Sequence, residues 1–522
     1  MRKILAEFKT GWNDAIKKYI FPYKAEYILG SIFVIIILWS EMYYDFFATY
    51  RNGINFWYAL FEGHPLSFYS YAGAIQGATP NRVMICDAAY DFTIYLFFAV
   101  WNFPAWLYER ISGNYAESCF VLVAWGKLMM PVIAVIVAGG MKKILEFITR
   151  NDNDTANMIY AYLFSGILIM AAYFIGQYDI IGVMFAVYGL YYYLKEDYKK
   201  FYLFFGIAIT CKYFALFLFI CLVLLYEKRL VYIVRDIVAG CWLVLLEKVI
   251  FSLGKSYESI HPSMVAENLN DTVSIVGTNL LSDRITYLFH LKMPMGVDVM
   301  SVFVFLIGLI WTWCYLIKRE EKYSFYYRVI YIAFCINTVF TLFTASTPYW
   351  AILIVPYMFL MIYCRGTNRK LNILLETVGI SCFIIWHFAR EPYFFSSKNC
   401  EGMLFYYLLG QPFYFEEGFS VALSKIAESG AVSSIISMIR SVFYACLLIM
   451  LVVNFPKRED NYISEKQEPG MRGLLLLRMV CMIGLLLIPV IVYVIQVLFN
   501  GTLCQIETSN QVMNEIVELL RS

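Results

Sequence analysis

The stretch FFGIAITCKYFALF, residues 204–217, decides the topology of the chain. It lies near the centre of the apolar segment 201–226 and carries Lys212. A lysine inside a membrane-spanning segment is energetically costly, and it is a candidate functional residue for that reason. We interpret 201–226 as two short helices that turn back at Lys212. At about 12 and 14 residues, or ~18 and ~21 Å, neither helix crosses a hydrocarbon layer of ~30 Å. Such broken helices are tolerated where they line a cavity within the protein.

The composition places this segment in a membrane protein. Of the 522 residues, 61% are hydrophobic and 15% are charged, whereas soluble domains average about 25% charged residues. Apolar runs of 18 residues or more recur along the chain, which is typical of membrane spans. The net charge of +2 gives no reason to expect a nucleic-acid partner.

Apolar runs predict an all-α, polytopic transmembrane helical bundle of about 13 spans, some of them short or broken. Residues 91–108 are apolar but contain Asn102 and Pro104, and we interpret them as an interfacial helix outside the membrane. Clear spans are predicted near residues 26–40, 117–140, 157–176, 230–251, 299–317, 329–346, 349–364, 371–388, 434–455 and 473–498.

The distribution of basic residues supports this topology. It puts six loops in the cytoplasm, which together hold 20 Lys and Arg, against seven in the outside loops after residue 141. Cytoplasmic loops of membrane proteins carry such an excess. A rival topology, with 91–108 and 201–226 each as a single span, stays open. The six loops are 141–155, 195–200, 227–235, 317–328, 365–370 and 456–472.

The preferred topology divides the chain into four parts. Residues 1–25 form a basic, amphipathic segment on the cytoplasmic surface. Residues 26–230 form a transmembrane core with juxtamembrane helices in the first extracytoplasmic loop, 41–116. Residues 231–498 add further spans, and residues 499–522 form an extracytoplasmic tail. Two more large outside loops lie at 252–298 and 389–433.

Acidic residues at the outer ends of predicted spans are candidates for chemistry. Glu41 and Asp45 are four residues apart and share one helix face if the first helix continues outward. A carboxylate at this depth can deprotonate a hydroxyl or hold a divalent cation. Gln177 and Asp179 lie in GQYDII at the next outer edge. The alternative interpretation is that these are ordinary helix-end acids, with Asp179 capping a helix.

Other charged or aromatic residues in the apolar segments can be explained by contacts with the lipid headgroups. Lys212 could bind a lipid phosphate as a point charge or extend to the headgroups. Lys127, ten residues into its span, could extend to the headgroups in the same way. Arg478, near the start of its span, is predicted to do so. The sequence STPYW at 346–350 is interpreted as a turn with aromatic anchors.

Several of these pieces, in order, resemble the GT-C superfamily of polytopic glycosyltransferases that use polyprenyl-phosphate-linked donors. They are the acid after the first span, the outside loop with two juxtamembrane helices, and two motifs. GQYDIIGVMFAVYGLYYYL at 176–194 is similar to the family's Gly-Gln-x-Asp span. FFGIAITCKYFALF is similar to its Gly-x-x-x-x-x-x-Lys element. The resemblance covers roughly residues 26–230.

The resemblance implies a function. The chain would transfer one sugar from a polyprenyl-phosphate donor to an extracytoplasmic glycan, lipid or protein acceptor, with inversion at the anomeric carbon. Asp45 would be the base, Glu41 and Asp179 supporting acids, and Lys212 a contact to the donor phosphate. The first loop lacks the family's closely spaced pair of acids, so it stays open whether Glu41 and Asp45 hold Mg²⁺ or Mn²⁺. Further candidates for substrate binding are Gln177, Tyr44 and His64.

This interpretation places the protein among membrane lipids, in the plasma membrane of a bacterium, with its site facing outside; for a eukaryotic source the membrane would be that of the endoplasmic reticulum. A flippase or transporter of lipid-linked oligosaccharides is the first alternative. Transporters commonly show inverted repeats with matching interrupted helices, and only one interrupted region is found, around Lys212. A polymerase or ligase of surface polysaccharides is the second alternative, in which loops 252–298 and 389–433 would matter most.

Overall fold

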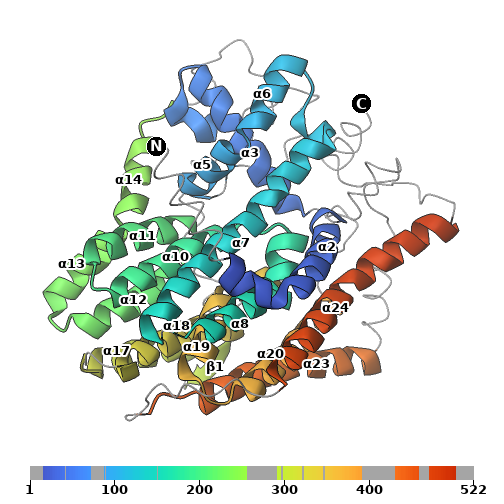
Figure 1. Ribbon diagram of the computed structural model, residues 1–522. Helices are drawn as coiled ribbons and strands as arrows, with labels where there is room; N and C mark the ends of the chain where they lie inside the picture. The colour runs from blue at the N-terminus through green and yellow to red at the C-terminus, as the bar shows by residue number, and fades with distance from the viewer. Residues whose placement is uncertain are drawn as a thin grey trace.

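The computed structural model describes residues 16–40, 43–71, 88, 90–149, 151–255, 291–295, 298–319, 323–344, 347–390, 430–457 and 470–500. These residues form an all-α helical bundle with one small β-hairpin (Figure 1). The fold class is therefore as predicted for this part of the chain. The hairpin pairs β1 (Lys292–Met295) with β2 (Asp298–Ser301) in antiparallel register.

Eight helical segments of the described chain are long and apolar enough to cross a membrane, so the chain is a multi-pass membrane protein. Each corresponds to one of the ten clear predicted spans. They are Lys17–Ser40, Phe120–Ile148, Asp152–Phe174, Tyr323–Phe343, Pro348–Arg365, Arg369–Ala389, Val432–Val453 and Met471–Ile491. The elements in them are η1 (Ile16–Ile20), η2 (Phe21–Tyr23), α2 (Lys24–Ser40), α7 (Phe120–Ile148), α8 (Asp152–Leu163), α9 (Gly166–Leu168), η5 (Ile169–Phe174), α18 (Tyr323–Phe343), η7 (Pro348–Leu353), α19 (Val355–Arg365), α20 (Arg369–Arg390), α23 (Gly430–Val453) and α24 (Met471–Asn500).

The predicted total of about 13 spans is not confirmed, because the remaining apolar segments form shorter helices. A helix of 16 residues extends only about 24 Å, less than the hydrocarbon thickness of ~30 Å. The shorter helices of the bundle are α10 (Asp179–Leu194), α11 (Tyr198–Cys211), α12 (Ala215–Tyr226), α13 (Leu230–Gly240), α14 (Trp242–Phe251) and α17 (Val302–Leu316).

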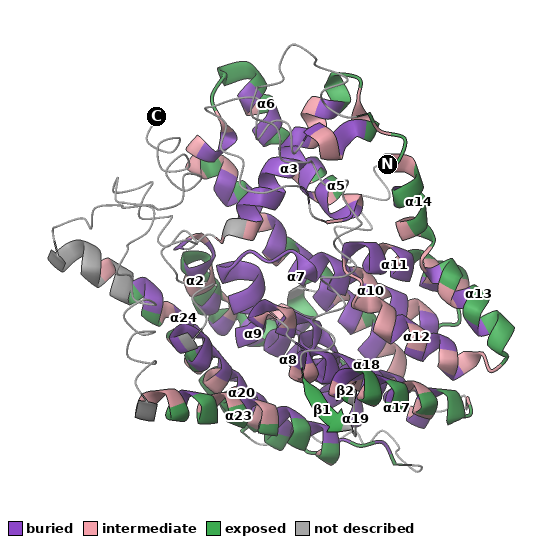
Figure 2. Cartoon of the chain, turned by 180° about the vertical axis from the view of Figure 1, so that it is seen from behind, coloured by how far each residue is buried: buried purple, intermediate pink, exposed green. Residues whose placement is uncertain are grey.

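Burial divides the bundle into an interior and a lipid-facing exterior. Figure 2 shows buried residues concentrated on α7, α8, α9 and α10, and exposed residues on α13 and α23. The exposed residues are largely apolar: Leu230 and Val231 of α13 are 74% and 78% exposed. Such apolar exposure is what a surface in contact with lipid tails requires, because lipid gives no penalty for it.

The break at Lys212 is present. Helix α11 ends at Cys211, Lys212 is extended with φ −155° and ψ 122°, and α12 begins at Ala215. The two helices then run back along each other. The rings of Phe201 and Phe219 stack at 5.1 Å, and those of Tyr198 and Tyr226 lie 4.9 Å apart. The helical hairpin inferred from one lysine in an apolar run is thus confirmed.

A cap of helices from the first predicted outside loop lies over one end of the bundle (Figure 1). We call it the head, and it comprises α3 (Tyr44–Phe61), η3 (Pro65–Ser67), α5 (Phe92–Trp101), α6 (Phe103–Ser112) and η4 (Ala116–Ser118). The predicted interfacial helix 91–108 is thus two helices that meet at Asn102. Helices α3 and α5 pack very closely at Gly53, where an added Cβ would lie 2.8 Å from the backbone of Phe98.

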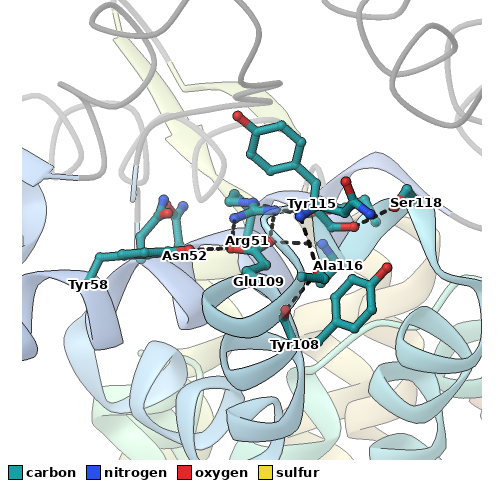
Figure 3. Close-up of polar contacts among 12 residues, drawn as sticks. Arg51, Asn52, Tyr58, Tyr108, Glu109, Tyr115, Ala116 and Ser118 are labelled. Carbon is teal, nitrogen blue, oxygen red and sulfur yellow. Dashed lines mark hydrogen bonds and ion pairs between the residues drawn. The ribbon is translucent and has the colours of Figure 1, made fainter. Parts of the chain in front are cut away.

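A buried cluster of charged residues holds the head together (Figure 3). Arg51 of α3 donates through Nε to Glu117, at 2.7 Å, and through its terminal nitrogens to Glu109, at 2.6 and 3.1 Å. Glu109 also accepts from the Tyr58 hydroxyl and from the Ala116 amide, at 2.8 and 2.9 Å. Removing one partner would leave an uncompensated buried charge, which is strongly destabilising. The cluster therefore fixes α3 against α6 and η4.

The predicted span at 230–251 is instead two helices, α13 and α14, which meet at Cys241. Helix α13 packs on the α11–α12 hairpin, where the Gly240 backbone touches the ring of Phe219. Helix α14 continues to the head (Figure 1). Glu247 and Lys248 account for the difference, because both charges find partners in the head.

Glu247 binds the N-terminus of α5. Its carboxylate accepts from the amides of Phe92 and Thr93, at 2.9 and 3.1 Å, and from the Thr93 hydroxyl. Lys248 pairs with Asp91 at 3.0 Å. A carboxylate is favourable at a helix N-terminus, where the first amides lack partners within the helix. Glu247 thus attaches α14 to the head.

This contact predicts a pH dependence of stability. Burial raises the pKa of Glu247 to about 7, against the hydrogen bonds from Thr93 and Phe92 that lower it. The folded protein therefore binds this proton more tightly than the unfolded chain does. The stability from Glu247 is complete below the pKa of an exposed glutamate and is lost as the pH rises through about 7. We expect the thermal unfolding midpoint to fall more between roughly pH 5 and 8 in the parent than in Glu247→Gln, which cannot titrate. Parallel curves for the two proteins would contradict this expectation.

Two ion pairs attach the helices α20 and α24 to the N-terminal half, and a third joins these two helices to each other. Arg472 pairs with Glu26, Arg369 with Asp154, and Arg478 with Glu376, at 2.6, 2.6 and 2.5 Å. Arg478 also donates to the Phe164 carbonyl at 3.2 Å. Both side chains of the Arg478–Glu376 pair are fully buried. The prediction that Arg478 extends to the headgroups is therefore wrong, because Glu376 compensates its charge inside the bundle.

Candidate functional site

Four of the predicted site residues meet where the head lies on the bundle. Asp45 is in the first turn of α3, and Asp179 begins α10. Gln177 lies between η5 and α10, and Lys212 lies at the break between α11 and α12. Residues separated by up to 167 positions in the sequence thus share one location.

The segment that carries Gln177 and Asp179 has an irregular backbone. The preceding turn, η5, is π-helical, and Gly176 follows with φ +84°, a conformation that favours glycine. An added Cβ on Gly176 would also lie 3.1 Å from the ring of Phe46. A Cβ added on Gly126 of α7 would likewise lie 3.2 Å from the Phe46 ring. Two glycines thus receive the ring next to Asp45 and set the position of α3 over this segment.

Lys127 of α7 lies beneath this segment. Its side chain is fully buried, and its ammonium group donates to the Phe174 carbonyl at 2.9 Å. The prediction that Lys127 extends to the headgroups is wrong, since the π-helical turn presents a carbonyl to it inside the protein. Lys127 therefore holds the end of η5, from which Gln177 and Asp179 follow.

Two polar contacts join the predicted residues. The Gln177 side-chain amide donates to the Asp45 carboxylate, Nε2 to Oδ2, at 3.3 Å. The Lys212 ammonium pairs with Asp179, Nζ to Oδ1, at 2.9 Å. Asp179 is 1% exposed and Lys212 is 11% exposed. Both contacts lie in a setting that excludes most water, where electrostatic interactions are stronger than in solution.

Aromatic rings surround the Lys212 ammonium. Its Nζ lies 4.6 Å from the ring centre of Tyr90, 5.3 Å from that of Tyr178 and 6.0 Å from that of Trp350. A cation is attracted to the face of such rings. Lys212 is therefore held at the break between α11 and α12, which refutes the alternative that it extends freely to the headgroups.

Tyr349 and Trp350 belong to STPYW, which we interpreted as a turn with aromatic anchors. The residues Pro348–Leu353 form a short helix, and both rings instead reach the site: Trp350 faces Lys212, and Tyr349 hydrogen-bonds to Asp45. The signal available in the sequence was two adjacent aromatic residues at an outer turn. This signal is common in membrane proteins, so it did not single out these two residues.

Burial raises the pKa of Asp45 above its usual range. The Lys212 charge and the hydrogen bond from Gln177 lower it in part, and the nearby Asp179 charge raises it. A carboxylate is a better general base when its pKa is raised toward neutral pH.

A cavity of about 20 Å³ extends from the polar residues toward the bundle interior. Small and apolar side chains of α10, α11 and α12 line much of it, among them Gly182, Ala208 and Ala215. Its volume suffices for a water molecule, so a sugar would have to occupy space opened by a movement of the surrounding helices.

The described structure places none of the remaining predicted side chains at this site. Glu41 lies outside the described residues, and for Tyr44 only the backbone, in α3, is described. His64 follows the far end of α3, roughly 25 Å from Asp45 along the helix axis, so the structure does not bring them together. In the described part of the chain no three His, Cys, Asp or Glu side chains gather to hold a metal ion.

Comparison of the sequence with known proteins finds no matching family model and no matching protein of curated function.

Proposed function

We propose that the chain is a glycosyltransferase that moves one sugar from a polyprenyl-phosphate carrier to an acceptor hydroxyl. The observation that carries this proposal is the convergence of a buried carboxylate and an enclosed ammonium group beneath the head. Asp45 accepts from Gln177, Lys212 at the break between α11 and α12 pairs with Asp179, and Gln177 and Asp179 are two residues apart. The resemblance of residues 26–230 to GT-C glycosyltransferases supports the same assignment.

In the proposed reaction Asp45 is the general base. The acceptor oxygen forms a bond to the anomeric carbon while the bond from that carbon to the phosphate oxygen breaks. The hydroxyl proton passes to Asp45, and the electron pair of the broken bond leaves with the polyprenyl phosphate. Attack from the face opposite the phosphate inverts the anomeric configuration. Gln177 orients the Asp45 carboxylate through its amide.

Lys212 has the role of binding the donor phosphate. The leaving phosphate gains negative charge in the transition state, so a fixed cation stabilises that state more than the ground state. Asp179 and the three rings hold the ammonium group in place before the donor arrives. Lys212 then does not have to move during the reaction, which is the advantage of a preorganised charge.

The test is an assay with purified protein, a panel of radiolabelled polyprenyl-phosphate sugars, and a membrane extract as acceptor. We expect transfer by the parent and a loss of about 10²–10³-fold in Lys212→Gln, the effect of removing one preorganised stabilising group. Lys255→Gln, which removes an exposed lysine that follows α14, is the control and should behave as the parent.

The same preparations in vesicles distinguish the main alternative. A flippase would move the lipid-linked sugar across the bilayer without forming a new glycosidic bond. Translocation without any transferred product, lost in Lys212→Gln, would overturn the glycosyltransferase proposal in favour of transport.

A further inference from the structure

A second group of lysines lies at the other ends of the helices that form the site. Asp179 begins α10 and Lys212 follows α11, whereas Lys195 follows the end of α10 and Lys200 is in the first turn of α11. The 16 residues of α10 separate the two locations by about 24 Å. Lys143, near the end of α7, joins the second group, and all three lysines are exposed.

These lysines are arranged around tyrosine rings. The Lys143 ammonium lies 5.2 Å from the ring centre of Tyr188 and 5.9 Å from that of Tyr191. Lys195 lies 5.1 Å from the same Tyr191 ring, so the two ammonium groups share one aromatic residue. Lys200 lies 4.9 Å from the ring of Tyr192, which touches Tyr191 at 5.2 Å. We call Lys143, Lys195, Lys200, Tyr188, Tyr191 and Tyr192 the tyrosine–lysine cluster.

The backbone of α7 is shaped to receive the cluster. Gly139 and Gly140 lie under Tyr188, where an added Cβ on Gly140 would be 3.1 Å from the ring. The Tyr188 hydroxyl then donates to the Ile136 carbonyl at 3.3 Å. The rings are therefore fixed between α7, α10 and α11, and the lysines are held around a rigid base.

Two of the three lysine charges in the cluster are not balanced by acids. Lys200 pairs with Asp197 at 2.8 Å, and Glu196 pairs with Arg319. Within the described ranges, Lys143 and Lys195 have no carboxylate at ion-pair distance. Two cations placed around one ring repel each other, and an anion between them would relieve that repulsion. Tyrosine rings are also typical of the level of the lipid headgroups.

We propose that the tyrosine–lysine cluster binds the phosphate of an anionic phospholipid headgroup. The lipid would lie with its phosphate between Lys143 and Lys195 and its tails along the exposed apolar face of α7, which includes Val135 and Ile136. Anionic lipids attract juxtamembrane lysines, with about 1 kcal/mol for each lysine. This proposal does not depend on the chemistry at Asp45 and Lys212.

The test measures lipid binding by native mass spectrometry of the full-length protein in detergent, titrated with phosphatidylglycerol or phosphatidylcholine. We expect the parent to bind phosphatidylglycerol more tightly. The double variant Lys143→Gln/Lys195→Gln should bind it about 30-fold more weakly, the change that corresponds to about 2 kcal/mol for two lysines. Lys143→Arg/Lys195→Arg keeps both charges and should retain binding, which also shows that the positions tolerate replacement.

A matched control removes two exposed lysines elsewhere, in Lys255→Gln/Lys370→Gln, and should retain the affinity of the parent. Equal binding of the two lipids by the parent would overturn the proposal. So would an affinity for phosphatidylglycerol that falls equally in the control and in Lys143→Gln/Lys195→Gln, because the effect would then be one of net charge. Displacement of the lipid by inorganic phosphate at similar concentrations would assign the cluster to a soluble anion and overturn the lipid assignment.

Discussion

Replacement of Asp45 by asparagine is expected to lower sugar transfer by about 10³–10⁴-fold, with little change in the amount of folded protein. A positioned general base contributes about 10²–10⁴-fold to the rate. The expected loss lies at the upper end because an amide cannot accept the hydroxyl proton, although it keeps the size and one acceptor oxygen of the carboxylate. The measurement is the rate of transfer from the radiolabelled donor that is active with the parent.

The pH dependence of the same reaction gives an independent test of Asp45. Burial raises the pKa of this carboxyl, so activity should fall on acidification at a higher pH than an exposed aspartate would give. In Asp45→Asn the residual activity should lack that acidic limb. A matched control is Asp197→Asn, because Asp197 lies at the end of α11 opposite to Lys212 and away from the site. Full activity of Asp45→Asn would move the base elsewhere, with Asp179 next among the described residues.

The second large effect concerns the ion pair inside the bundle. Replacement of Arg478 by methionine should lower the free energy of unfolding by about 3–5 kcal/mol, because Glu376 is left as an uncompensated buried charge. The double variant Arg478→Met/Glu376→Leu should recover most of that loss, since an apolar pair of similar volume needs no compensation. The measurement is the midpoint of thermal unfolding in detergent, followed by tryptophan fluorescence.

A control for this pair is the ion pair of Lys18 with Asp152, whose side chains are 48% and 55% exposed. Exposed ion pairs contribute about 0–1 kcal/mol, so Lys18→Met should shift the unfolding midpoint only slightly. A double variant as unstable as Arg478→Met would contradict the explanation by charge and would point to a packing defect.

The break at Lys212 and the helices of the head could be predicted because each has a local cause. A lysine in an apolar run forces a choice between a costly buried charge and a broken helix. The pair at Asn102 and Pro104 likewise limits a helix within 91–108. Sequence alone was sufficient at these places, since the determining residue lies within the segment that it changes.

Contacts between distant segments could not be predicted in this way. The partners of Lys127 and Arg478 are a carbonyl at the end of η5 and a glutamate on α20, and neither can be identified without the packing of the bundle. A charged residue in a span was therefore assigned to the headgroups by default. The place of Trp350 at the site could not be predicted for the same reason, because it depends on the packing of η7 beside α10.

The separations between contacting residues also limit the order in which the chain can assemble during synthesis. Arg51 meets Glu117 after only 66 further residues, so the contacts of the head can form early. The contact of Glu247 with Phe92 spans 155 positions, so it can form only after another 130 residues beyond Glu117 have been synthesised. Arg478 contacts the Phe164 carbonyl across 314 positions. Its ion-pair partner Glu376 is synthesised earlier and stays uncompensated until Arg478 has been added. Chains that fold through such intermediates are most vulnerable while the last partner is missing. A ribosome stalled before residue 478 would thus present a chain whose head is already built and whose bundle is still open to quality-control proteases.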